Sequence, residues 1–155
     1  VSADEYRTAA AKDTSLPKLG RTAAKAVKPL AEKHIHRVFV LALLAKPNRF
    51  EACAWLDGKR TDRAERSLGR FKRESDAAKF VAALYDAGAT EVIVPDVYRS
   101  KDGNLFADGL LVRLPRAPAK RKAIRKVCDQ LQRRKLGAVQ PDADIGETHL
   151  FLSLA

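Results

Sequence analysis

The sequence predicts an α+β domain in which two helices cover one face of a four-stranded antiparallel sheet. Three observations support this fold class. Apolar segments of strand length recur along the chain, two other segments repeat apolar residues at helical spacing, and a turn separates the two middle strands. The resulting order is strand, insertion, helix, strand, strand, helix, strand. This order is typical of the split βαβ, or ferredoxin-like, arrangement, in which right-handed crossovers place both helices on one face.

Residues 1–33 are expected to form a basic arm, and residues 34–155 a single domain. Large apolar residues are sparse in the arm, and Pro17, Gly20 and Pro29 should interrupt any long helix. Such a segment cannot bury enough apolar surface to offset the entropy lost on ordering. We therefore expect the arm to be disordered, or to form short helices on a partner.

The first strand of the domain is expected over residues 37–45. This segment, RVFVLALLA, is a continuous apolar run, which is typical of a strand buried on both faces. A polar insertion over residues 47–74 follows it. Within the insertion, residues 50–56 fit a strand or a short helix equally well, and residues 59–73 are polar enough to be exposed.

Two helices are indicated by apolar residues at helical spacing. The first begins at Ser75-Asp76, which can cap a helix, and ends at Ala87-Gly88. The second covers residues 120–135. Its apolar stripe follows the spacing i, i+3, i+4, i+7, with Ile124, Val127, Cys128 and Leu131.

The remaining strands are expected over residues 91–98, 105–114 and 148–154. The first two form a hairpin, and Pro95 places the earlier one at an edge or a bulge. In the last strand, leucines alternate with other residues, so one sheet face is covered. The other face would carry Phe151, His149 and Phe39, and would be open or covered by the insertion or a partner.

Positive charge is the strongest chemical signal in the sequence. The 155 residues include 30 Lys and Arg against 19 Asp and Glu, a net charge of +11. Residues 75–114, which contain most of the expected strands, hold four basic and six acidic side chains. The positive charge is therefore concentrated on other elements.

Two basic clusters form the predicted interface, one in the insertion and one on the outward face of the last helix. Like charges spaced i, i+4 along a helix repel unless an anion lies between them. Guanidinium groups suit bidentate contacts with phosphate. The predicted nucleic-acid-binding residues are Lys59, Arg60, Arg63, Arg66, Arg70, Lys72, Arg73, Lys120, Arg121, Lys122, Arg125, Lys126, Arg133, Arg134 and Lys135.

We therefore expect a non-catalytic protein that binds DNA or RNA through backbone phosphates, without sequence preference. The alternative is a protein-interaction module that binds an acidic protein surface or forms a homodimer. It would associate through the open sheet face or an edge strand.

Other classes of function lack their motifs. Asp96 and Asp108 could be neighbours across the hairpin, but no nucleophile accompanies them, so we expect no enzymatic activity and no cofactor. His34 and His36 would share a strand face, but no third ligand follows at a characteristic spacing, so we expect no metal.

The sequence also bears on compartment. No apolar run approaches the roughly 18–20 residues of a membrane span, and no signal peptide is visible. Cys53 and Cys128 are interpreted as small buried apolar residues. We expect a cytoplasmic protein.

Overall fold

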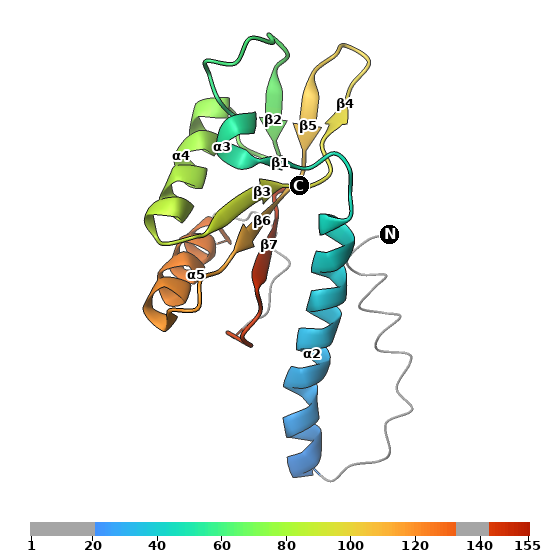
Figure 1. Cartoon of the computed structure of the whole chain (residues 1–155), viewed down its shortest axis with the longest axis vertical. Helices are drawn as coiled ribbons and strands as arrows, with labels where there is room; N and C mark the ends of the chain where they lie inside the picture. The colour runs from blue at the N-terminus through green and yellow to red at the C-terminus, as the bar shows by residue number, and fades with distance from the viewer. Residues whose placement is uncertain (1–20, 133–142) are drawn as a thin grey trace.

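A computed structural model describes residues 21–132 and 143–155, so the predictions for 1–20 and 133–142 lie outside the described residues. The helices and strands follow one another along the chain as labelled in Figure 1. They are α2 (Arg21–Leu44), β1 (Phe50–Glu51), α3 (Ala52–Trp55), β2 (Arg66–Leu68), α4 (Glu74–Asp86), β3 (Glu91–Val94), β4 (Tyr98–Arg99), β5 (Leu105–Ala107), β6 (Gly109–Arg113), α5 (Pro118–Gln132) and β7 (His149–Ser153).

The fold is α+β and contains a four-stranded antiparallel sheet, in the order β1-β3-β6-β7. A smaller sheet has the order β2-β5-β4. The ferredoxin-like arrangement is not confirmed. A split βαβ unit places a strand between the two strands that flank its helix. Here β6 and β7, which flank α5, are direct antiparallel neighbours.

The expected strand at 37–45 is wrong, because this segment belongs to α2. Short apolar runs do not distinguish a buried strand from a buried helix. Its inward side chains follow helical spacing, with Phe39, Val40, Leu43 and Leu44 toward the sheet and Leu41 55% exposed. The helix also continues through Pro29 and across the expected domain boundary at 33/34.

No helix in the described part of the chain is long and apolar enough to span a membrane.

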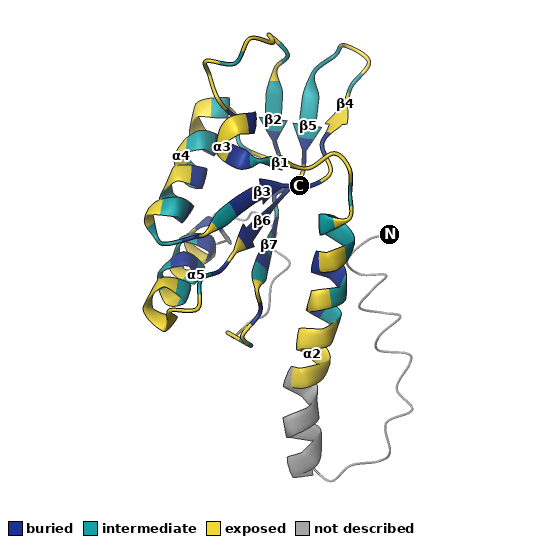
Figure 2. Cartoon of the chain, viewed as in Figure 1, coloured by how far each residue is buried: buried dark blue, intermediate teal, exposed yellow. Residues whose placement is uncertain are grey.

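Helices lie on both faces of the large sheet (Figures 1 and 2). The main core lies between one face and α3, α4 and α5, where Val81, Leu84 and Ile124 pack with sheet leucines and valines. The opposite face is covered by α2. There Val40 packs with Ile93 and Leu111, in a smaller cluster separate from the main core.

The predicted helices are largely confirmed in their described parts. Residues Glu74–Asp86 form α4, and Gly88, with φ 115°, ends the turn that follows it. Residues Pro118–Gln132 form α5, with Ile124 and Cys128 fully buried.

The expected hairpin is present but broken twice. Asp96, with φ 58°, separates β3 from β4, and Asp108 separates β5 from β6. The polar segment 59–73 was expected to be exposed, yet it contains β2, whose Leu68 is buried. Cys128 is buried as expected, whereas Cys53 is exposed, and both are free thiols.

Candidate nucleic-acid interface

Two arginines of the predicted insertion cluster are matched by the protein's own carboxylates. Arg60 donates to both oxygens of Glu74, at 3.0 and 2.9 Å, and Arg66 donates to both oxygens of Asp62, at 2.7 and 2.9 Å. Their side chains are only 16% and 9% exposed. The Arg60–Glu74 pair ties the loop before β2 to the first turn of α4, and the Arg66–Asp62 pair joins the start of β2 to the same loop, so both guanidinium groups already have a carboxylate partner.

The acidity of the two carboxyls reflects these clamps. The hydrogen bonds from Arg66 lower the pKa of Asp62 to about 2. Burial opposes ionisation of Glu74, but hydrogen bonds from the Arg60 side chain and the Arg66 backbone outweigh it and lower the pKa. Both carboxylates therefore remain charged and paired at neutral pH.

Two arginines of α5 are matched in the same way by the loop before β7. Arg121 donates to both oxygens of Asp144, at 2.9 and 2.7 Å, and Arg125 donates to Glu147 at 2.5 Å. The Glu147 side chain is 1% exposed. Hydrogen bonding to Arg121 lowers the pKa of Asp144 to about 2. These contacts attach the loop to α5.

The other predicted residues have different outcomes. Eight are exposed in the structure: Lys59, Arg63, Arg70, Lys72, Arg73, Lys120, Lys122 and Lys126. Arg133, Arg134 and Lys135 lie outside the described residues.

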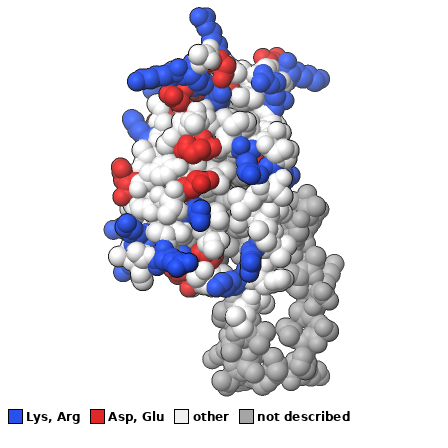
Figure 3. Space-filling view, in the orientation of Figure 1, with Lys and Arg blue, Asp and Glu red and all other residues white. Residues whose placement is uncertain are grey.

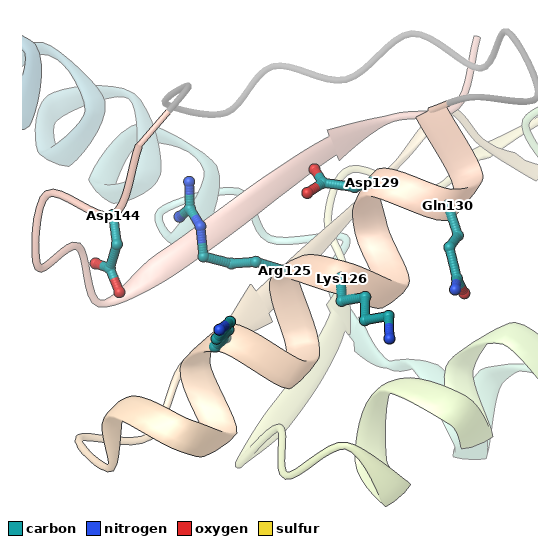
Figure 4. Close-up of a pocket in the computed structure, with 6 residues that line it drawn as sticks. Arg125, Lys126, Asp129, Gln130 and Asp144 are labelled. Atoms are coloured by element: carbon teal, nitrogen blue, oxygen red, sulfur yellow. The ribbon is translucent and has the colours of Figure 1, made fainter.

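Lys122 and Lys126 of α5 line a hollow of about 520 Å³ (Figure 4). Lys122 and Lys126 are spaced i, i+4, which places them about 6 Å apart along the helix. Asp129, Gln130 and Asp144 contribute to the same hollow. No ion pair joins either lysine to a carboxylate within 21–132 and 143–155. We refer to Lys122 and Lys126 as the α5 face.

The two predicted clusters do not form one surface. Figure 3 shows Lys and Arg gathered toward both ends of the molecule, with acidic side chains between them. The loop 57–65 has three basic and three acidic residues, so its charges cancel. In α5, five basic residues accompany one acidic residue, Asp129. Over the whole segment 59–73 there are seven basic and two acidic residues, so both predicted clusters keep an excess of positive charge.

The sheet face that carries Phe151 and His149 is covered by α2 and not by the insertion. Phe39 of α2 packs edge-on against Phe151, with ring centroids 5.0 Å apart. His36 is buried, and its Nε2 donates to the carbonyl oxygen of His149 at 2.5 Å. His34 is exposed, because residues two apart lie on different sides of a helix. No group of three metal-ligating residues occurs among those described.

The two aspartates considered for catalysis have separate surroundings. Asp96 is exposed and pairs with Lys46 at 3.5 Å. Asp108 lies at the break between β5 and β6 and is exposed. Both aspartates are exposed, so neither has the buried environment that would raise the pKa of a catalytic carboxyl group.

The sequence reasoning missed the carboxylates that neutralise α5. Asp144 and Glu147 lie in the loop before β7, where Asp144 also accepts from the Gly146 N–H at 2.9 Å. The available signal was a group of acids in the loop that follows a basic helix.

Comparison with known proteins gives no match: no family model, no curated protein and no solved structure is significantly similar to the chain. The fold and surface define it as an α+β protein with a lysine-lined hollow on one helix.

Proposed function

We propose that the protein binds nucleic acid through backbone phosphates, without sequence preference, and that the α5 face is its main contact. The observation that supports this proposal is the placement of Lys122 and Lys126 on one hollow, exposed and without an acidic partner among the described residues. The nearby arginines are already bound to Asp144 and Glu147. The lysines are therefore the charges left for an external anion.

The exposed basic residues of the segment 59–73 have a secondary part in this proposal. Arg60 and Arg66 are excluded from it, because their guanidinium groups serve Glu74 and Asp62. Lys59 and Arg63 lie in the loop 57–65, whose formal charges sum to zero, and Arg70, Lys72 and Arg73 lie beyond β2 and are also exposed. A polyanion gains little from the neutral loop, and we expect α5 to be the main contact because its two exposed lysines share one hollow.

The test is a titration of labelled single-stranded and duplex oligonucleotides, followed by fluorescence anisotropy between about 50 and 200 mM salt. Removing both lysines in Lys122→Ala/Lys126→Ala should reduce the slope of log K against log salt by about 1.8 for duplex DNA, because each lost phosphate contact accounts for about 0.9. Weakening should be similar for unrelated sequences.

A matched control removes the same charge from β4 of the small sheet and the turn that follows it. Arg99→Ala/Lys101→Ala also deletes two exposed cations, but neither lies on α5. The control should leave the slope nearly unchanged. No binding to DNA or RNA at low salt, or the same loss of slope in both double variants, would refute the proposal.

A further inference from the structure

The small sheet carries a stacked aromatic pair on its outer side. Tyr98 of β4 is in register with Phe106 of β5, which is in register with Ser67 of β2. The rings of Tyr98 and Phe106 are stacked, with centroids 5.6 Å apart and planes 18° apart. Tyr98 is 50% exposed and Phe106 is half-buried. We call Tyr98, Phe106 and Ser67 the aromatic face.

The aromatic face is the solvent side of a sheet whose other side is in the core. Alternation along a strand sends successive side chains to opposite faces. Val97, Leu68 and Ala107, the neighbours of the three aromatic-face residues, are all buried in the main core. Core packing therefore fixes the outward direction of Tyr98 and Phe106.

The charge beside this face is negative. Burial, and then the nearby Asp108 carboxylate, raise the pKa of Tyr98. Asp108 is exposed, and so is Glu65, which alternation places on the same side as Ser67. No ion pair engages either carboxylate within the described ranges. Arg99 follows Tyr98 on β4, so alternation directs it to the other side of the sheet.

A polyanion would meet repulsion from these two carboxylates, so this face is not a second phosphate site. An aromatic ring next to a carboxylate attracts a cation through both groups. Arginine suits such a site better than lysine, because its planar guanidinium can stack on a ring while it donates to a carboxylate.

The edge of the small sheet favours a partner in extended conformation. β4 is at the edge in the order β2-β5-β4. The Ser100 N–H donates to the Asn104 carbonyl oxygen, so residues 100 and 104 form a hydrogen-bonded pair of the antiparallel ladder. Such pairs alternate with pairs that are not hydrogen-bonded, so 98 and 106 form the next hydrogen-bonded pair and 99 and 105 do not. The N–H and C=O of Arg99 therefore point to the outer edge, where no strand of the described chain pairs with them. An extended peptide can bond there.

We propose that the aromatic face binds an arginine side chain from an extended segment of a partner protein, with the guanidinium stacked on Tyr98 and bonded to Asp108. This surface is separate from the α5 face. Two different partners can therefore be bound by the two surfaces, and the proposal does not depend on nucleic-acid binding.

The test uses the full chain and a short peptide of alternating glycine and arginine, followed by NMR chemical-shift changes and calorimetry at about 0.15 M salt, where the Debye length of about 8 Å screens the distant α5 charges. The same peptide with citrulline in place of arginine is the matched neutral probe. We expect the arginine peptide to shift the ring resonances of Tyr98 and Phe106, and the citrulline peptide to bind several-fold more weakly.

Three variants locate the site. Tyr98→Ala should weaken binding about five- to tenfold, and Asp108→Asn should also weaken it, whereas Lys122→Ala/Lys126→Ala should leave it unchanged. Tyr98→Phe should retain most of the affinity, which separates stacking from loss of folding. Equal binding of the two peptides, or unchanged binding in Tyr98→Ala, would overturn the proposal.

The same experiments also show whether nucleic acid or a second copy of the chain occupies the aromatic face. A single-stranded oligonucleotide that shifts the Tyr98 ring resonances would assign the face to nucleic acid and overturn the proposal. Concentration-dependent self-association that Tyr98→Ala abolishes would place a second copy on the face, with the same consequence. Loss of oligonucleotide binding alone would refute the role of α5 and leave the aromatic face as assigned.

Discussion

The substitution Glu147→Gln tests whether the arginines paired with this carboxylate contribute to stability at the expense of nucleic-acid binding. The Glu147 side chain is 1% exposed. It accepts hydrogen bonds from Arg125 at 2.5 Å and from the Ile145 N–H at 3.0 Å, and Arg121 lies 3.8 Å away. Glutamine has nearly the same size and shape, so the substitution removes the charge and leaves the packing.

The expected loss follows from these contacts. A hydrogen bond to a charged group contributes about 1.5–3 kcal/mol, against about 1 kcal/mol for a neutral one. The guanidiniums of Arg121 and Arg125 have side chains 11% and 14% exposed, so water can solvate them in part after the change. We therefore expect a loss of about 2 kcal/mol, below the 3–5 kcal/mol for breaking a fully buried pair. For a chain of this length that corresponds to a melting temperature lower by about 4–8 °C.

Binding should change in the opposite direction. With Glu147 neutral, Arg125 is no longer bound to a carboxylate there, and the α5 region gains a positive charge. Oligonucleotide affinity at low salt should rise, and the salt slope should steepen by up to about 0.9. Thermal unfolding by circular dichroism and anisotropy titration measure the two effects on the same samples.

A control makes the result specific. Glu65→Gln is the same chemical change at an exposed residue with no ion pair among the described residues, and it should alter stability by less than about 0.5 kcal/mol. A melting temperature within about 1 °C of the parent in Glu147→Gln, or weaker oligonucleotide binding, would refute the reasoning.

Three further predictions concern stability. Phe39→Ala should reduce hydrogen-exchange protection of α2 by about 3 kcal/mol while the amides of β6 keep theirs, since α2 packs on a cluster separate from the main core. Gly69→Ala should cost more than about 2 kcal/mol in urea unfolding, because Gly69 has φ 53° and a Cβ there would lie 2.2 Å from Leu154; Gly58→Ala, with open space around it, should be nearly neutral. Burial and neighbouring basic groups lower the pKa of His149 from its usual 6.5, so the unfolded chain protonates first. The free energy of unfolding should therefore fall as the pH drops below about 6.5, and His149→Asn should flatten that fall.

Periodicity predicted the elements that have one apolar stripe. The segment that became α5 was identified from Ile124, Cys128 and Leu131, and β7 from its alternating leucines. The same reasoning misassigned residues 37–45, because a run that is apolar at nearly every position has no visible period. Phe39 and Leu43 lie on one apolar stripe of α2, and this stripe can be seen only when the whole segment Arg21–Leu44 is known to be helical.

The candidate site was less predictable, because charge pairing depends on contacts that are distant in sequence. Arg121 and Asp144 are 23 residues apart, so no local pattern in the sequence indicates their contact. From composition alone, Arg121 and Arg125 of this helix are both expected to be available for phosphate contacts. The stacking of Tyr98 on Phe106 depends in turn on the register of a two-residue strand. Neither contact has a local signature in the sequence.

In the candidate interface, several arginines are bound to carboxylates, whereas the exposed basic groups on α5 are lysines. This difference limits how the proposed interface can recognise nucleic acid. Arg60, Arg66 and Arg121 each donate two hydrogen bonds to one carboxylate, a geometry that a planar guanidinium provides and an ammonium does not. The groups left on α5 are lysines, which act as compact charges on flexible stems. The fixed fork of an arginine is better suited than a flexible ammonium to a bidentate contact with the guanine edge in the major groove. The α5 face lacks that arrangement in its described residues, so the nucleic-acid binding proposed for it should follow phosphate density and salt, and should be indifferent to sequence.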